Sequence, residues 1–225
     1  VESIAALVRE LHAALDESGL DYAIICIDDG SPDGSFQLLA ELAAADPRLI
    51  VGAFRRNFGQ TAAMQAGISA ARGAVIVTLD ADLQNDPQDI PAMLSHLDTW
   101  DAVTGWRVNR AACDSLVRRV SSRIANRVRN ALSDETIQDS GCTFRAFRRE
   151  CLRDLVLYKG FHRFIPTLLK MRGFRVLEVP VNHRPRRFGQ SKYGIGNRAA
   201  RAFVDLLVVR WMKDRLLRYE VAESL

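Results

Sequence analysis

Through the first half of the chain, segments with the apolar spacing of helices alternate with short apolar segments typical of buried strands. A helix is expected over residues 4–15, where apolar residues recur every three or four positions. Strands are expected over residues 22–27, 49–54, 74–79 and 101–106, with helices from residue 33, over 59–71 and over 86–97 between them. This order predicts an α/β fold, with a Rossmann-like, mostly parallel sheet flanked by helices on both faces.

The first expected element is a helix, although a doubly wound sheet normally begins with a central strand. We therefore expect a strand that precedes residue 1 to be missing from this numbering. Beyond Trp106 the pattern predicts an Arg-rich helix, a short strand, two helices and a last strand, at residues 114–132, 142–147, from 149, 161–171 and 174–181. Residues 1–193 are expected to form one domain, and residues 194–225 a C-terminal amphipathic helix.

The charge of the chain is divided unevenly along its length. Residues 1–101 hold 16 acidic against 5 basic side chains, whereas residues 102–225 hold 11 against 26. The second half should therefore attract anions, which are phosphates, nucleic acid or an anionic membrane surface. The nucleic-acid interpretation is the weaker one, because the basic region has few interleaved aromatic residues and no known nucleic-acid motif, so no nucleic-acid partner is expected.

The cysteines and the hydropathy pattern favour a protein of the reducing cytosol. Cys26, Cys113, Cys142 and Cys151 are scattered without metal-ligand spacing and are expected to be reduced core residues. No run of about 18 apolar residues is present, and no signal-peptide pattern, so the chain as given is not expected to span a bilayer.

Acidic side chains follow two of the expected strands at the point where each strand ends, which is where open α/β sheets bind ligands. Asp80, Asp82 and Gln84 follow the strand at 74–79 and form a hard oxygen-ligand set suited to Mg²⁺ or Mn²⁺. Asp28 and Asp29 follow the strand at 22–27. In both places, the alternative is that the acidic residues belong to a turn or cap a helix. This alternative is weaker for Asp80 and Asp82, since another aspartate already caps the next helix.

Five motifs together resemble a family 2 glycosyltransferase with the GT-A fold, in the bacterial branch of dolichyl- and polyprenyl-phosphate sugar transferases. They occur in the order of that family, at residues 28–31 (Asp-Asp-Gly-Ser), 56–67 (Arg-Asn-Phe-Gly-Gln with Ala66-Gly67), 80–84 (Asp-Ala-Asp-Leu-Gln), 139–142 (Asp-Ser-Gly-Cys) and 186–193 (Arg-Arg-Phe-Gly-Gln-Ser-Lys-Tyr). Family members open with a strand, which agrees with the strand expected before residue 1.

The resemblance implies roles for individual residues on the donor side. Asp29, or Asp28 with Asp29, would contact the base or ribose of the donor, while Asp80, Asp82 and Gln84 would surround the divalent metal. Asp139 would be the general base and, with Asp82, a catalytic residue. Four residues would close over the diphosphate, for which a solvated basic turn is the alternative: Arg186, Arg187, Ser191 and Lys192.

On the acceptor side, Arg107 ends a strand, and Arg118 and Ser122 lie four positions apart on one expected helix face. Together they would hold a phosphate monoester, as in the family, where the acceptor is a polyprenyl phosphate lipid. The alternative is a solvated helix face. In the last helix, Phe203 and Trp211 are interleaved with Arg and Lys, which favours binding to a membrane surface over packing on the domain or on a second subunit of a homo-oligomer.

The sequence therefore predicts an inverting hexosyltransferase, with a UDP-sugar favoured over GDP-mannose as donor and a polyprenyl phosphate at the cytosolic membrane face as acceptor. A saccharide or other acceptor is one alternative. A module that binds a nucleotide sugar or nucleic acid without turnover is the other.

Overall fold

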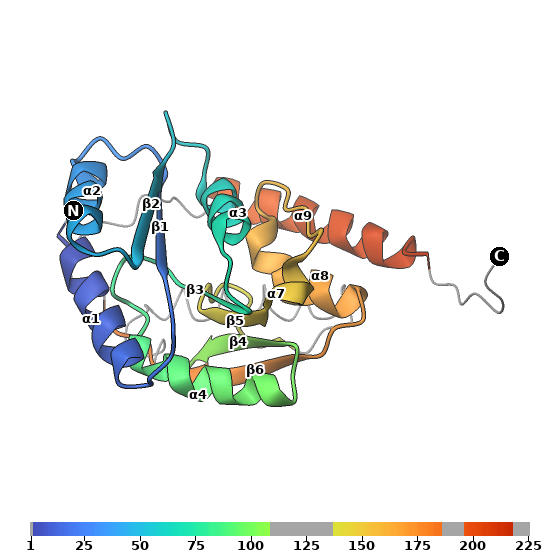
Figure 1. Cartoon of the computed structure of the whole chain (residues 1–225). Coiled ribbons are helices and arrows are strands. Elements are labelled where there is room, and N and C mark those ends of the chain that lie inside the picture. The colour runs from blue at the N-terminus through green and yellow to red at the C-terminus, as the bar shows by residue number, and fades with distance from the viewer. Residues whose placement is uncertain (1, 109–136, 186–195, 218–225) are drawn as a thin grey trace, which may run out of the picture.

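Two separate sheets form the centre of the molecule in the computed structural model, which describes residues 2–108, 137–185 and 196–217 (Figure 1). Strands β1 (Ile24–Asp28) and β2 (Leu49–Ala53) pair in parallel. The second sheet has the order β3-β5-β4-β6, built from β3 (Val75–Thr78), β4 (Ala102–Arg107), β5 (Arg145–Arg148) and β6 (Val176–Val181). In this sheet β4 and β6 are parallel, and β5 runs antiparallel to both β3 and β4.

Helices connect the strands in the alternating order that the sequence predicts. They are α1 (Ile4–Asp16), α2 (Ser35–Ala45), α3 (Gln60–Ala70), α4 (Ile90–Ser95), α7 (Arg149–Leu152), α8 (Ile165–Met171) and α9 (Gly196–Asp214). The helix expected over 86–97 is α4 with a short 3-10 helix on each side, and another 3-10 helix, Phe161–Phe164, precedes α8. The expected helix at 114–132 lies outside the described residues.

The apolar core is divided by the larger sheet into two clusters, one on each face. In the first, Leu7, Val8 and Leu11 of α1 pack with Ile90 of α4 against the strands. In the second, α7, α8 and α9 pack on the opposite face. An α/β sheet covered on both faces is what the alternation of elements predicts. The strand expected before residue 1 stays a prediction.

Three cysteines are free thiols, as expected from their scattered positions; Cys113 lies outside the described residues. Cys142 and Cys151 are buried, and Cys26 is partly buried on β1. Burial raises the pKa of both Cys26 and Cys151 to about 11, so both stay protonated near neutral pH.

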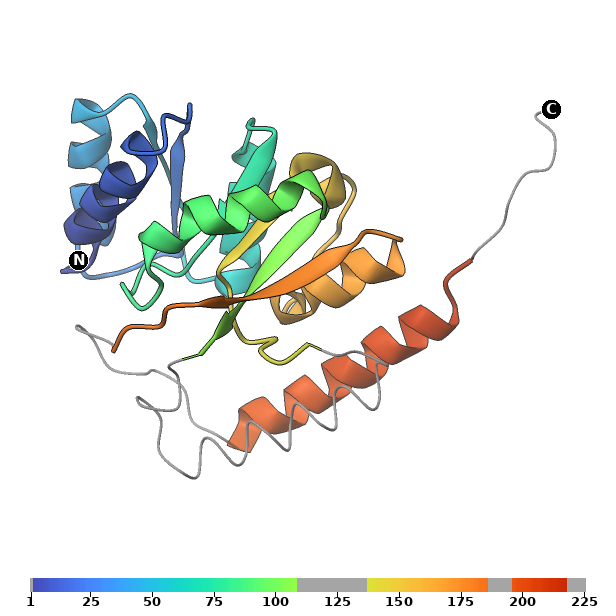
Figure 2. The ribbon, with the colours of Figure 1, turned by 90° about the horizontal axis from the view of Figure 1, so that it is seen from below.

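Helix α9 runs along the outside of the domain (Figure 2). Leu206 and Val209 are buried in the second core cluster. On the part of the helix turned away from that cluster, Trp211 is 62% exposed and Phe203 48% exposed. Among the described helices, none is both long and apolar enough to cross a membrane.

Candidate active site at the carboxyl ends of β1, β3 and β4

The carboxylates Asp80 and Asp82 lie directly after β3, as the sequence predicts. Between Asp82 and Gln84, Leu83 has a positive φ of 61° and is only 2% exposed. Its side chain belongs to the first core cluster. Because a positive φ is unfavourable for leucine, burial of this side chain holds the strained turn that keeps Asp82 and Gln84 on the surface of the loop.

Asp80 is oriented by a side chain to which the sequence assigned no separate role. Nε2 of Gln60, the first residue of α3, donates a hydrogen bond of 2.8 Å to Oδ1 of Asp80. Burial raises the pKa of Asp80, and the negative charge of Asp82 raises it further, although contacts with Thr143 and Gln60 act in the opposite direction. A divalent cation bound beside these two carboxylates would offset the cost of ionising Asp80.

The donor set fits a magnesium or manganese ion that completes its coordination with substrate. Within the described ranges, no group of three or more His, Cys, Asp or Glu side chains could hold a metal. The loop instead offers two carboxylates and an amide, and Mg²⁺ is commonly held by one or two carboxylates together with substrate phosphates. Nε2 of Gln84 lies 3.3 Å from the carbonyl oxygen of Arg184 and 3.3 Å from Nε2 of His183, which fixes the orientation of the amide.

The raised pKa of Asp80 predicts that this residue destabilises the metal-free protein at neutral pH. Between its ordinary and its raised pKa, the folded state binds more protons than the unfolded state, so stability falls as pH rises through this interval. Asp80→Asn should therefore raise the Tm in EDTA at pH 7 by a few degrees, since about 1 kcal/mol corresponds to roughly 2–4 °C in a domain of this size. Calorimetry at decreasing pH should show the gain disappearing as wild-type Asp80 becomes protonated. A gain that persists at pH 3 would contradict this account.

Asp28 and Asp29 accept different hydrogen bonds from the loops around them. Asp28 is buried, and its Oδ2 accepts a hydrogen bond of 3.0 Å from the backbone N–H of Ser31. Asp29 accepts hydrogen bonds from Nδ2 of Asn57 (2.8 Å) and from the backbone N–H groups of Phe58 (2.7 Å) and Gly59 (2.9 Å). Asp29 thus organises the loop that leads to α3, while its predicted contact with a donor stays a prediction.

The loop that leads to α3 contacts residues of two predicted motifs. Asp29 of the first motif binds the loop, and Gln60, where the loop meets α3, contacts Asp80 of the second motif. Gly30 packs directly under it, because a Cβ placed on Gly30 would lie 2.6 Å from the carbonyl carbon of Arg56. The guanidinium of Arg56 lies over the ring of Phe58, 4.7 Å from its centre.

Gly30→Ala should destabilise the protein more than the same change at Gly34. Both glycines have a positive φ, 71° and 81°, but a Cβ on Gly34 meets nothing within 4 Å. We expect Gly34→Ala to cost about 1 kcal/mol from backbone strain, and Gly30→Ala about 2–4 kcal/mol because the loop must also move. Urea unfolding of the two variants measures the difference. Equal losses would mean that the close approach to Arg56 carries no cost.

Asp139 and Arg107, for which the sequence predicted separate roles, form a buried ion pair. Nε of Arg107 lies 2.6 Å from Oδ2 of Asp139, and Nη2 lies 2.8 Å from Oδ1. Their side chains are 16% and 7% exposed. Although burial alone would lower it, the pKa of Arg107 is raised by Asp139 and, to a smaller extent, by Asp80, so the ion pair lies close enough to the loop of residues 80–84 to interact electrostatically with it.

A fully buried arginine, which sequence reasoning missed, supports this part of the site. Arg145 on β5 is 0% exposed and donates hydrogen bonds to the carbonyl oxygens of His162 (2.6 Å) and Ser140 (3.1 Å). Burial lowers its pKa to about 10, so it remains charged at neutral pH. It fixes the segment that carries Asp139. A single arginine within a strand pattern does not indicate that its side chain binds a distant loop.

The segment of residues 182–185 is bound to the loop of residues 80–84. The backbone N–H of Arg184 donates to the carbonyl oxygen of Gln84 at 2.8 Å, and the guanidinium of Arg184 pairs with Asp86 and Glu10. The chain therefore enters the predicted diphosphate loop beside the carboxylates. The other predicted site residues lie outside the described residues: Arg118, Ser122, Arg186, Arg187, Ser191 and Lys192.

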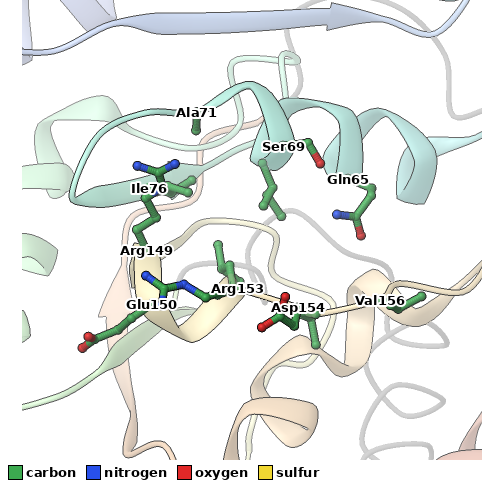
Figure 3. A pocket seen from close by; sticks show the side chains of 12 residues that line it. Gln65, Ser69, Ala71, Ile76, Arg149, Glu150, Arg153, Asp154 and Val156 are labelled. Carbon is green, nitrogen blue, oxygen red and sulfur yellow. The ribbon is translucent and has the colours of Figure 1, made fainter.

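A cavity of about 470 Å³ lies elsewhere, between α3 and α7 (Figure 3). Ile76 and Leu152 line it together with charged side chains that include Arg149 and Asp154. None of the predicted site residues lines this cavity. This cavity is therefore separate from the candidate site at the strand ends.

Comparison with known proteins places this geometry in a family. The family model for glycosyl transferase family 2 matches residues 2–156. A mannosyltransferase from Pyrobaculum calidifontis, solved in complex with GDP-Man and Mn²⁺, superimposes with a TM-score of 0.54 at 20% identity. That match covers 92% of this chain and 60% of the mannosyltransferase, so this chain spans less than two thirds of its length.

Two further structures cover most of both chains. Mannosyl-3-phosphoglycerate synthase from Rubrobacter xylanophilus matches with a TM-score of 0.64 at 16% identity, over 99% of this chain and 74% of that one. Glucosyl-3-phosphoglycerate synthase from Mycobacterium tuberculosis, in complex with Mn²⁺, UDP-glucose and phosphoglyceric acid, matches with a TM-score of 0.62 at 16% identity, over 91% and 84%. At these identities the likeness establishes the shared fold, and the predicted Rossmann-like GT-A fold is confirmed.

Proposed function

The chain belongs to glycosyl transferase family 2, and from this premise we propose that it transfers a hexose from a nucleoside diphosphate sugar to a polyprenyl phosphate at the cytosolic face of a membrane. The observation that carries the donor half is the pair Asp80 and Asp82 at the end of β3, with Gln60 holding Asp80 at 2.8 Å. In an open α/β sheet this edge is where nucleotide ligands bind.

Asp80, Asp82 and Gln84 would hold Mg²⁺ or Mn²⁺. When bound, the ion supplies positive charge to the leaving nucleoside diphosphate. The choice of metal and donor is supported by two of the structural relatives, which were solved with Mn²⁺ and either GDP-Man or UDP-glucose. Of the two donor classes we favour a UDP-sugar, with GDP-mannose as the alternative.

On the acceptor side, the ion pair between Arg107 and Asp139 supports a role in binding more than in proton transfer. A phosphate monoester is already an anion near neutral pH, so it needs little help from a base. An oxygen of the acceptor phosphate attacks the anomeric carbon in line, the bond from that carbon to the diphosphate breaks, and the configuration inverts. Asp139 fixes Arg107, whose charge attracts the acceptor phosphate.

The membrane location is supported by the outer part of α9. Five large apolar side chains of this helix are more than 40% exposed: Phe203, Val204, Leu207, Val208 and Trp211. Arg210 of this helix and Arg215, which directly follows the end of the helix, are also exposed. Apolar and basic side chains together are typical of a helix that lies on an anionic lipid surface.

The test supplies the full-length protein with Mn²⁺, a panel of labelled UDP- and GDP-sugars, and either undecaprenyl phosphate, dolichyl phosphate or 3-phosphoglycerate. We expect a lipid-linked sugar product with one donor. The phosphoglycerate arm matters because two structural relatives are synthases of phosphoglycerate sugars. Product on 3-phosphoglycerate alone would replace the acceptor assignment, and no product with any donor and acceptor would overturn the proposal.

Vesicle binding tests the membrane assignment separately. We expect the chain to co-sediment with vesicles that contain anionic lipid, and the double variant Leu207→Asp, Trp211→Asp to lose at least tenfold in affinity, because both side chains are exposed and would be withdrawn from the lipid. The matched control is Phe36→Asp, which changes an exposed apolar residue of α2. Equal loss in both proteins, or no loss in either, would exclude α9 as the contact.

A further inference from the structure

A glutamate on β6 holds the backbone of the segment that carries Asp139. The carboxylate of Glu178 accepts hydrogen bonds from the N–H of Gln138, at 2.8 Å and 3.0 Å to its two oxygens, and from the N–H of Asp139 at 2.8 Å. Hydrogen bonds to an ionised acceptor are stronger than those between neutral groups. The contact spans 39 and 40 positions of the chain, so it fixes a loop relative to a strand of the central sheet.

We propose that Glu178 is a positioning residue for the transfer reaction: it places Asp139 so that the carboxylate of Asp139 meets Arg107 in the two-bond geometry. This rests on the function proposed above. Asp139 is thereby held from two directions, with its backbone bound by Glu178 of β6 and its side chain bound by Arg107 at the end of β4.

The pairing of β4 and β6 fixes the position of Glu178 relative to Arg107. β4 and β6 are parallel neighbours, with Thr104 opposite Glu178 and Arg107 opposite Val181. The two residues that grip Asp139 therefore stand on adjacent strands whose spacing the sheet fixes. A loop bound to two adjacent strands can position a side chain to within a fraction of an ångström. A displacement of about 1 Å at a reacting centre lowers the reaction rate roughly a hundredfold.

The loop is also held beyond Asp139. The carbonyl oxygen of Ser140 accepts a hydrogen bond of 3.1 Å from Nη2 of Arg145, and the N–H of Cys142 donates to the carbonyl oxygen of Asp139 at 3.2 Å. Removing Glu178 should therefore release the segment before and at Asp139 and leave the segment after it bound. The expected result is local misplacement of Asp139 with the fold retained.

The experiment compares Glu178→Ala with Glu178→Gln and with the control Glu150→Ala, an exposed glutamate of α7. Oε1 of Glu178 accepts both N–H groups, so the glutamine oxygen can keep one bond to each. We expect kcat to fall roughly 10–100-fold in Glu178→Ala, with the KM for the donor within threefold of wild type. Glu178→Gln should recover most of kcat, and Glu150→Ala should match wild type.

A second measurement does not depend on turnover. Hydrogen exchange of the Gln138 and Asp139 amides should become at least tenfold faster in Glu178→Ala and stay near the wild-type rate in Glu178→Gln. Unchanged exchange, unchanged kcat in an active enzyme, or equal losses in Ala and Gln variants would overturn the inference. A wild-type protein without any product would contradict the proposed function instead, while the exchange rates would still decide whether Glu178 holds this loop.

Discussion

Asp82→Ala is expected to reduce kcat at least a thousandfold, which corresponds to about 4 kcal/mol of lost transition-state stabilisation. Asp82 is one of two carboxylates at the end of β3, and its Oδ1 accepts a hydrogen bond of 3.1 Å from the N–H of Gln84. Under the proposed function, its removal leaves one carboxylate that would hold the metal, so the charge on the leaving diphosphate would be neutralised less well. Turnover with the best donor of the panel measures the loss.

Two controls separate this loss from general effects of charge and folding. Asp98→Ala removes the same charge from an exposed position in a 3-10 helix after α4, and it should retain wild-type turnover. Manganese binding, followed by electron paramagnetic resonance in the presence of a nucleoside diphosphate, should weaken in Asp82→Ala and not in Asp98→Ala. Undiminished product formation by Asp82→Ala would remove the basis of the donor-site assignment.

Arg107→Met is expected to have the largest effect on stability. It removes the guanidinium that pairs with the carboxylate of Asp139, which is 7% exposed. Removing one partner of a buried pair costs about 3–5 kcal/mol, and in a domain of this size that lowers the Tm by roughly 10 °C. Urea unfolding and calorimetry both measure this change. A loss below about 1 kcal/mol would show that the pair is solvated in solution.

The double variant Arg107→Met, Asp139→Leu distinguishes a folding role from a functional one. Replacing both members of a buried ion pair by apolar groups is often nearly neutral for stability, so we expect most of the lost stability to return. Activity should stay absent if the proposed function is right, because the acceptor phosphate would then lose its cation and the loop would lose its carboxylate. If activity returned together with stability, the ion pair would serve the fold alone.

Local sequence pattern was sufficient to predict the secondary-structure elements and one edge of the candidate site. The helices and strands of the described residues follow the predicted order, because burial of one face imposes a period on the sequence that can be read without the structure. The strand-end rule located Asp80 and Asp82 for the same reason. It could not show that β5 runs antiparallel between β3 and β4, since spatial order in a sheet is not the order along the chain.

The sequence alone thus determined the fold class, the family resemblance and the carboxylates after the strands, all of which depend on neighbouring residues. Only the tertiary structure showed that Arg107 pairs with Asp139 and that Glu178 holds the same loop. It also showed that Gln60 orients Asp80. These contacts join residues 20 to 40 positions apart. Strand register and loop closure decide them, and no local spacing in the sequence encodes either.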